Sequence, residues 1–245
     1  MANLITASEV ISKAFTNSNT DTALIKDSFI EIAQYNHLRP AIGEDLYNLI
    51  ISEKSASVVW KYTITSSITS GSKDIADDDS AETTNFDNLL VNMYVEGTGI
   101  PLFKDDYTDN EDNHYTKIVS KTDGSNISLN ASATATNATA SLTYYTPIGY
   151  LVEKYIKDLL AFAIKFEALP DMTYNSTSQG VVENIADFTT PVSSKKLSFL
   201  RNEIYKQAQT YKRKMIEFIN QEDLNYPLYI PDDESTTKRS GIIMY

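Results

Sequence analysis

The hydrophobic periodicity of this chain changes twice, and these changes constrain its fold more than any other feature. Residues 1–56 carry apolar side chains at helical spacing, and strand-like alternation then begins and continues to about residue 146. Helical spacing returns at Pro147 and lasts to about Glu222. We therefore expect an α+β protein, an α-helical bundle interrupted by a small inserted all-β domain of sandwich or barrel type.

The first helical block contains signals for three short helices. Ser8, or Thr6 just before it, can cap the first helix, and Asp21 can cap the second. Pro40 suits the first turn of a third helix. Gly43 lies within that helix and should weaken it by about 1 kcal/mol relative to alanine.

The second helical block restarts at Thr146, a good N-cap, followed by Pro147 at the first helical position. Residues 148–168 are apolar almost all round, which is typical of a helix at the centre of a bundle. Pro170 is expected to end this helix. A last helix, over residues 194–222, has apolar residues spaced by threes and fours and a charged opposite face.

The interruption is predicted to form five or six short strands. Alternation is clear around Trp60, Tyr62 and Ile64, and Asp123–Gly124 favours a hairpin turn. The remaining strands are predicted at 89–95, 115–119, 126–129 and 141–145. The Ala/Thr/Asn/Ser tract 131–140 tolerates strand structure but has little to bury, and the acidic stretches 70–88 and 104–113 are expected to be long loops.

We thus expect three parts: a helical domain from residues 1–56 and 147–223, an inserted β domain from 57–146, and an extended C-terminal tail, 224–245. Exposure of the two apolar clusters in the tail to water is unfavourable, so we expect them to dock onto a partner. These candidate interface residues are Tyr226, Leu228, Tyr229, Ile230, Ile242, Ile243, Met244 and Tyr245.

Negative charge is concentrated in the interruption. Of the net charge of −12, residues 69–114 contribute −10, because they hold twelve acids and two lysines (2 − 12 = −10). Such a surface repels polyanions, so charge-driven nucleic-acid binding is not expected. No apolar run is long enough to span a membrane, and the first residues do not have the pattern of a signal peptide.

The sequence offers little for catalysis or cofactors. Cysteine is absent, and the two histidines, His37 and His114, are far apart in sequence. The acids of 74–79 have no glycine turn of the kind calcium loops use, and a solvated loop is the simpler interpretation. Asp105 and Asp106 are adjacent and should point apart. We expect no enzyme activity, catalytic residue, metal or cofactor, and we attribute the sixteen tyrosines to packing and interfaces rather than to a glycan groove.

Specific segments of the sequence resemble a known protein family. The run ITASEVISKAF and the run IKDSFIEIAQYNHLRPAIGEDLYNLI resemble the portal-attached head–tail connector (adaptor) proteins of tailed bacteriophages, of the crAss-like phage type. The family pattern falls on Ala33, Gln34, Leu38, Pro40, Ile42, Gly43, Leu46 and Tyr47. The likeness covers about 1–56 and 147–230. The interruption, with Gly97–Thr98–Gly99–Ile100–Pro101, more weakly resembles β modules of virion proteins.

The resemblance implies a structural virion protein of the neck, made in the host bacterial cytoplasm. It implies a homo-oligomeric ring, twelvefold as in the family, beneath the portal protein and joined to downstream ring or tail proteins. Such a ring extends the channel through which genomic DNA passes at ejection without specific binding. The tail of family members reaches onto the portal, and the apolar residues 242–245 fit strand addition.

Two alternatives remain open at the level of sequence. The chain could be a second-ring or tail-completion protein that binds another adaptor. The β insertion could also contact a glycan, a receptor or other virion proteins.

Overall fold

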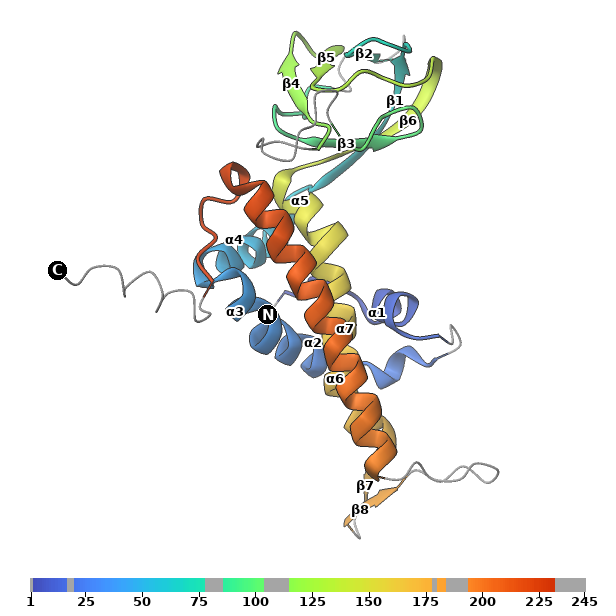
Figure 1. Ribbon diagram of the computed structural model, residues 1–245, viewed down its shortest axis with the longest axis vertical. Helices are drawn as coiled ribbons and strands as arrows, with labels where there is room; N and C mark the ends of the chain where they lie inside the picture. The colour runs from blue at the N-terminus through green and yellow to red at the C-terminus, as the bar shows by residue number, and fades with distance from the viewer. Residues whose placement is uncertain are drawn as a thin grey trace, which may run out of the picture. The chain divides into compact units, whose positions relative to one another are not determined.

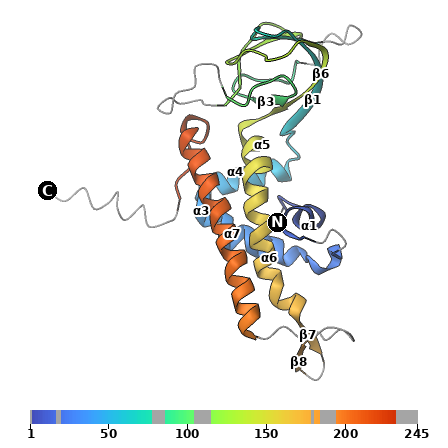
Figure 2. The same cartoon turned by 45° about the vertical axis from the view of Figure 1, so that its right-hand side comes forward.

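The computed structural model describes residues 2–16, 20–77, 86–103, 115–177, 180–183 and 194–231 (Figure 1, Figure 2). The chain forms two compact units. Unit 1 is helical and contains Met1–Ser57, Val152–Glu217 and Leu228–Tyr245, while unit 2 contains Val58–Leu151 and Phe218–Pro227. The protein is of mixed α+β class, as the sequence predicts.

Unit 1 opens with short helices whose ends are set by local hydrogen bonds. Helix α1 (Ala7–Ala14) begins at a capping box, in which the Thr6 hydroxyl accepts from the Glu9 amide and the Glu9 carboxylate accepts from the Thr6 amide. Asp21 caps only the short 3₁₀ turn η1 (Thr22–Leu24), and its side chain accepts from the Ala23 amide. The following helices are α2 (Asp27–Ala33), the π-helical turn η2 (Gln34–Leu38), α3 (Arg39–Ile42) and α4 (Glu44–Ser55).

The predicted third helix differs from the structure at its start and at Gly43. It does not begin afresh at Pro40, because α2, η2 and α3 follow one another without a break. The π turn directly before Pro40 is the kind of irregularity that accommodates a proline inside a helix. The helix then ends at Gly43, whose φ of 83° lies in the left-handed region that favours glycine, and α4 starts at the next residue.

The second part of unit 1 is built on α6 (Lys157–Thr173), which continues from the π-helical turn η3 (Val152–Ile156). As its apolar pattern predicts, α6 is the central helix, and α1 and α2 pack against it. Its buried positions are Leu159, Leu160, Ala161, Ala163, Ile164 and Ala168. Pro170 does not end α6, contrary to the prediction, because the helix continues through the proline to Thr173.

The last helix, α7 (Ser194–Gln221), runs beside α6 in the opposite direction in both ribbon views (Figure 1, Figure 2). The two helices are joined by stacking of Phe162 on Tyr211, with ring centroids 5.0 Å apart and planes inclined by 14°. A small hairpin that the sequence did not predict, β7 (Tyr174–Thr177) and β8 (Gly180–Glu183), follows α6.

Unit 2 is a curled, fully antiparallel sheet of six strands in the order β3-β6-β1-β2-β5-β4. The strands are β1 (Lys61–Ile68), β2 (Asp74–Asp77), β3 (Tyr94–Gly97), β4 (Ile118–Lys121), β5 (Asn126–Leu129) and β6 (Asn137–Tyr145). The two outer strands are also linked, because Ile118 donates to Met93 and Val95 donates to Thr116 through backbone hydrogen bonds of 3.0 and 3.1 Å. This linkage curls the sheet around its core, as the prediction of a barrel-like module requires.

Several strand predictions were wrong in detail. Residues 89–93 form turns rather than the start of a strand, and β3 begins only at Tyr94. Residues 74–77, expected within a loop, form β2, because Ile75 is buried in the core between exposed or half-buried neighbours. The tract 131–140 also contributes to the interior, since Ala131, Ala133 and Ala140 are buried.

Helix α5 (Pro147–Leu151) belongs to unit 2 and begins as predicted. The Thr146 hydroxyl accepts from the Gly149 amide at 3.0 Å, and the Thr146 carbonyl accepts from the Tyr150 amide. Residues 218–227 also belong to unit 2, although the sequence placed 147–223 in the helical domain and 224–245 in the tail. Within the described chain, no helix combines the length and apolar character that a bilayer span needs.

Candidate partner interface

Tyr226, the first residue proposed for partner contact, is part of the interior of unit 2. Only 2% of its surface is exposed, and its hydroxyl donates to the Pro147 carbonyl at 2.8 Å. Its ring packs edge-on against Phe218, with centroids 5.8 Å apart. A side chain held in this way is not available to another protein. The prediction that Tyr226 contacts a partner was therefore wrong.

The residues after Tyr226 return to unit 1 and touch the corner between α3 and α4. A Cβ atom added to Gly43 would lie 1.9 Å from the carbonyl oxygen of Ile230, so this close approach is possible only with glycine. Gly43 thus has two reasons to be glycine, its positive φ and its contact with the chain at residue 230. We call residues 228–231 the exit segment.

The exit segment presents apolar side chains to solvent while its backbone lies against Gly43. Leu228 is 40% exposed and Ile230 is 56% exposed, whereas Tyr229 is half-buried and interacts with its surroundings. These three candidate interface residues therefore lie together on unit 1. The other four candidates, Ile242, Ile243, Met244 and Tyr245, lie outside the described residues.

The end of α7 is fixed in unit 2 by a buried polar cluster that the sequence did not reveal. The Glu222 carboxylate accepts hydrogen bonds from Tyr94 at 3.0 Å, from Asn225 at 2.8 Å and from the ammonium of Lys117. The Glu222 and Lys117 side chains are both almost completely buried. Burial lowers the pKa of Lys117, although the contact with Glu222 opposes this effect. Burial, followed by the neighbouring Tyr226 and Glu222, raises the pKa of Tyr94 far above its usual value.

An aromatic cluster surrounds these polar groups within unit 2. Tyr94 stacks on Tyr150 with centroids 4.2 Å apart, and Phe218 lies 6.0 Å from Tyr94 and 5.6 Å from Tyr150. Tyr144 is buried in the core of the sheet, where its hydroxyl lies 3.1 Å from that of Ser66. The interpretation of these tyrosines as packing residues agrees with the structure, because their rings face the interior rather than a groove.

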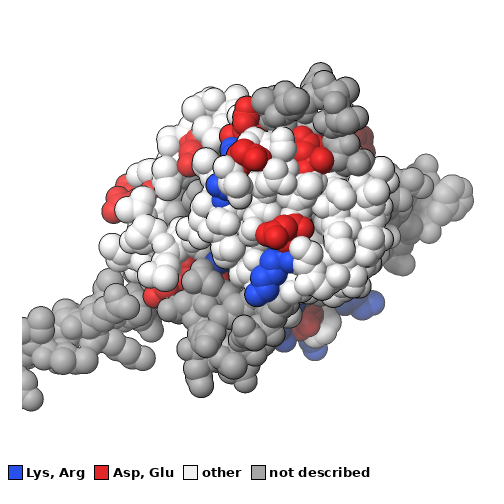
Figure 3. Space-filling model, turned by 90° about the horizontal axis from the view of Figure 1, so that it is seen from above, with Lys and Arg blue, Asp and Glu red and all other residues white. Residues whose placement is uncertain are grey.

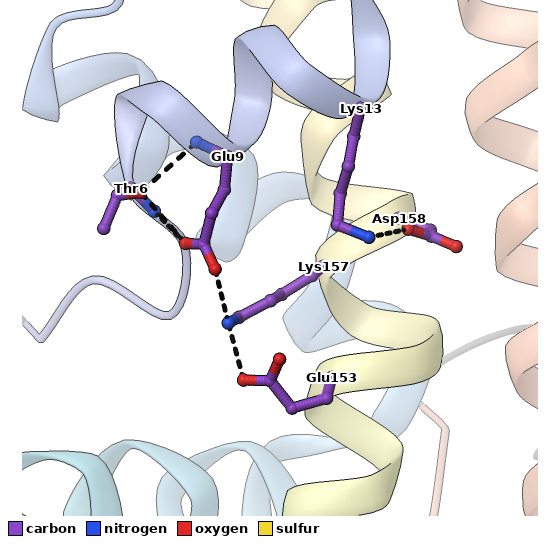
Figure 4. A network of polar contacts seen from close by, with 6 residues as sticks. All are labelled: Thr6, Glu9, Lys13, Glu153, Lys157 and Asp158. Atoms are coloured by element: carbon purple, nitrogen blue, oxygen red, sulfur yellow. Dashed lines mark hydrogen bonds and ion pairs between the residues drawn. The ribbon is translucent and has the colours of Figure 1, made fainter. Parts of the chain in front are cut away.

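In unit 1, a second polar network joins α1 to the helix formed by η3 and α6 (Figure 4). The ammonium of Lys157 lies 2.6 Å from Glu9 and 2.5 Å from Glu153. Burial alone would lower the pKa of Lys157, but the hydrogen bonds to Glu153 and Glu9 raise it. Burial alone would raise the pKa of Glu9, but the hydrogen bonds from Lys157 and Thr6 hold it below its usual value. Lys13 and Asp158 add an ion pair of 2.6 Å beside this network.

Of the histidines and paired acids considered for chemistry, only His37 lies in the part of the chain that the structure describes. His37 lies 2.9 Å from the Glu167 carboxylate and packs edge-on against Phe166, which suits a residue that joins η2 to α6. His114, Asp105 and Asp106 lie outside the described residues. Across the part of the chain that the structure describes, no three His, Asp or Glu side chains gather as a metal site would require.

Helix α7 is basic, although the protein as a whole is acidic. The helix carries seven cations (Lys195, Lys196, Arg201, Lys206, Lys212, Arg213 and Lys214) and two acids (Glu203 and Glu217), a local charge of +5 (7 − 2 = +5). Phe199, the most exposed aromatic side chain on this helix at 67%, lies among them. A basic face that also exposes a phenylalanine is suited to contact with an acidic protein surface.

One comparison with known proteins places the chain in a family. The family of unknown function DUF6712 matches residues 101–239, which is more than half of the chain. No curated protein and no solved structure matches the chain. The match begins within unit 2 and runs through α6, α7 and the exit segment, so it includes part of the β insertion that the sequence resemblance left out. The chain is therefore a member of the DUF6712 family.

Proposed function

We propose that this protein is a structural component of a phage virion, a head–tail adaptor that forms a ring beneath the portal and joins it to the tail. In this role it extends the DNA channel and carries out no catalysis. The proposal begins from the likeness of residues 1–56 and 147–230 to portal-attached adaptors. The geometry that supports it best is the exit segment on unit 1.

The exit segment has the properties of an anchored docking element. Its backbone lies directly against Gly43 at Ile230, at the corner between two helices. Leu228 and Ile230 nevertheless remain exposed, and the apolar residues 242–245 follow them in sequence. Exposed apolar side chains on a fixed backbone lose less conformational entropy on binding than those on a free chain. This supports a role in holding a neighbouring protein.

The composition of the chain supports passage of DNA without retention. The net charge of −12 is repeated in every copy of a ring, so a closed assembly would carry a large negative charge. Head-to-tail contacts between identical subunits close into a ring when their rotation allows it. In our proposal the ring contains twelve copies and remains in the neck of the virion.

Capture by the portal tests the proposal directly. Immobilised portal protein of the same phage should retain the full-length chain, and removal of residues 241–245 should weaken retention without unfolding the protein. Leu228→Ser combined with Ile230→Ser should also weaken it, because both exposed side chains of the exit segment are lost. Leu224→Ser is the matched control, since Leu224 is as exposed but belongs to the short turn η4 (Asp223–Asn225) in unit 2.

Two results would contradict the proposal in different ways. Failure of the intact chain to bind portal would exclude direct attachment, and binding to another adaptor instead would favour a second-ring or tail-completion role. Equal retention of all variants would exclude the exit segment and tail as the contact. Glycan binding by unit 2 is a weaker alternative, because Tyr94, Tyr144 and Tyr150 are buried.

A further inference from the structure

The outward face of α7 forms a continuous stripe that unit 1 leaves exposed. Lys195, Phe199, Lys206 and Arg213 are separated by four, seven and seven residues, so they line one side of the helix. The opposite side carries the buried residues Ile204, Ala208 and Met215. The stripe covers about 27 Å, at ~1.5 Å per residue over the 18 steps from Lys195 to Arg213.

Lys206 and Arg213 are available for contacts with another molecule. Lys206 forms an ion pair with Glu203 at 2.6 Å, but both side chains are largely exposed, so this pair is weak. Arg213 is exposed and faces solvent two turns further along the helix. Phe199 adds apolar area to the stripe, which a purely solvated charged face would not need.

Unit 2 offers the opposite charge at its β4–β5 turn. The backbone amide of Phe86 donates to the carbonyl of Gly124, and the amide of Asp77 donates to that of Ser125. One carboxylate oxygen of Asp77 is buried, whereas Asp87 and Asp123 are exposed where these bonds meet the turn. We call Asp87 and Asp123 the acidic turn. Figure 3 looks onto the end of unit 2 that carries β2, β4 and β5, where carboxylates and a few basic side chains are set among uncharged atoms.

The acidic turn matches the stripe in more than charge. The Asp123 carboxylate accepts from the amides of Ser125 and Asn126, which fixes its position and holds its pKa below the usual range. Leu90 and Val91, three and four residues after Asp87, are exposed apolar side chains. The turn therefore combines carboxylates with apolar surface, as the stripe combines cations with Phe199.

We propose that the α7 stripe of one copy of this chain binds the acidic turn of the next copy. The contact is heterologous, because two different surfaces meet, and it leaves one stripe and one turn open at the ends of any chain of copies. This contact would join neighbouring subunits of the proposed ring. In that respect the inference rests on the proposed function. Favourable charge in this contact should mainly speed association and set its salt dependence.

A nucleic acid is the other class of molecule that a basic helix could bind. The observations favour a second copy, because the chain as a whole is acidic and repels polyanions at a distance. The complementary acidic surface is present on every copy at equal concentration. DNA binding is therefore an outcome that the test must be able to detect.

Charge reversal with mixing tests the contact. Lys206→Glu with Arg213→Glu makes the stripe acidic, and Asp87→Lys with Asp123→Lys makes the turn basic. Sedimentation velocity should show concentration-dependent association of the wild type that declines as salt rises from ~50 to ~500 mM. Each double variant alone should be at least tenfold weaker in association. An equal mixture of the two should recover wild-type association, because every stripe then meets a turn of opposite charge.

Controls separate this result from folding and from simple net charge. Lys26→Glu with Lys61→Glu changes the net charge by the same −4 as the stripe variant but lies elsewhere, and it should associate like the wild type. Circular dichroism should be unchanged in all variants. Fluorescence anisotropy with a DNA duplex tests for DNA binding. The wild type and the stripe variant should give the same result, because the stripe does not bind DNA.

The inference is overturned if the wild type stays monomeric at low salt, if the mixture fails to recover association, or if the stripe binds DNA instead. Portal capture separates this inference from the proposed function. Recovery in the mixture without portal capture would keep the subunit contact and reject the adaptor role. Portal capture without recovery would keep the adaptor role and reject this contact.

Discussion

The carboxylate of Glu222, at the end of α7, accepts a hydrogen bond of 3.0 Å from the hydroxyl of Tyr94 on β3, 128 residues earlier in the chain. The same oxygen accepts from Lys117 and Asn225, so one buried carboxylate connects four residues of unit 2. Such a cluster is sensitive to the loss of any member, because each remaining group then loses a buried partner.

Replacing Glu222 by alanine should lower the free energy of unfolding by about 3–5 kcal/mol, because the buried ammonium of Lys117 would lose the carboxylate that neutralises it. Glu222→Gln should cost less, since an amide oxygen still accepts from Tyr94 and Asn225. Urea unfolding measures both. Glu217→Ala removes an exposed acid from the same helix and should stay within about 0.5 kcal/mol of the wild type. Equal losses for Glu222→Ala and Glu217→Ala would contradict the role of the cluster.

Replacing Gly43 by alanine should destabilise the protein through both backbone strain and collision with Ile230. Gly71 is the matched comparison, because its φ of 79° is similar to the 83° of Gly43 but nothing lies near its missing side chain. Gly71→Ala should therefore cost only the strain, about 1–2 kcal/mol. Gly43→Ala should cost more and should also speed limited proteolysis within 228–231. If the two variants lose equal stability and cleavage is unchanged, the exit segment is not held at Gly43.

Replacing Gly149 by alanine should lower stability although alanine is the better helix former. At an unconstrained helical position this change stabilises by about 1 kcal/mol. At Gly149 the new methyl group would lie 2.3 Å from the carbonyl oxygen of Trp60, so α5 or the start of β1 must shift. Thermal unfolding monitors the change, with Asn220→Ala on exposed α7 surface as a control expected to be neutral or stabilising. A rise in the melting temperature of Gly149→Ala would show that this contact is not formed.

Acid should weaken unit 1 through Glu9. The pKa of Glu9 is held below its unfolded value of 4.5, so its ionised form contributes stability that is complete above that value. The contribution is lost as pH falls through the lower folded pKa. Glu9 is partly exposed, so we expect less than ~1 kcal/mol. In Glu9→Gln, the free energy of unfolding should no longer show this loss as pH falls from neutral to acid. Asp45→Asn should still show it. Stability curves of wild type and Glu9→Gln that stay parallel below pH 4.5 would contradict this assignment.

Local signals in the sequence predicted the features that depend only on neighbouring residues. The caps at Thr6 and Thr146 follow from short-range hydrogen bonds, and the burial of α6 follows from its apolar pattern. Alternation likewise predicted that the interruption forms strands, although not how they pair. The caps and the central helix need no information from distant parts of the chain.

The errors arose where distant residues decide the outcome. Asp74 and Asp77 made β2 resemble a loop, but the sheet supplies partners on both sides and a buried site for Ile75. Glu222 resembled one more exposed charge at a helix end until Lys117 and Tyr94, far away in sequence, were brought to it. Tyr226 was taken for a partner contact for the same reason. Its hydrogen-bond acceptor is 79 residues away.

The contact between Gly43 and Ile230 sets a geometric limit on what the chain can reach. Ile242 is eleven residues beyond Pro231 (242 − 231 = 11). A polypeptide extends at most ~3.6 Å per residue, so Ile242 can lie no further than about 40 Å from Pro231, and Tyr245, fourteen residues beyond it (245 − 231 = 14), no further than about 50 Å. Any receptor for residues 242–245 must therefore offer its pocket within about 50 Å of Pro231.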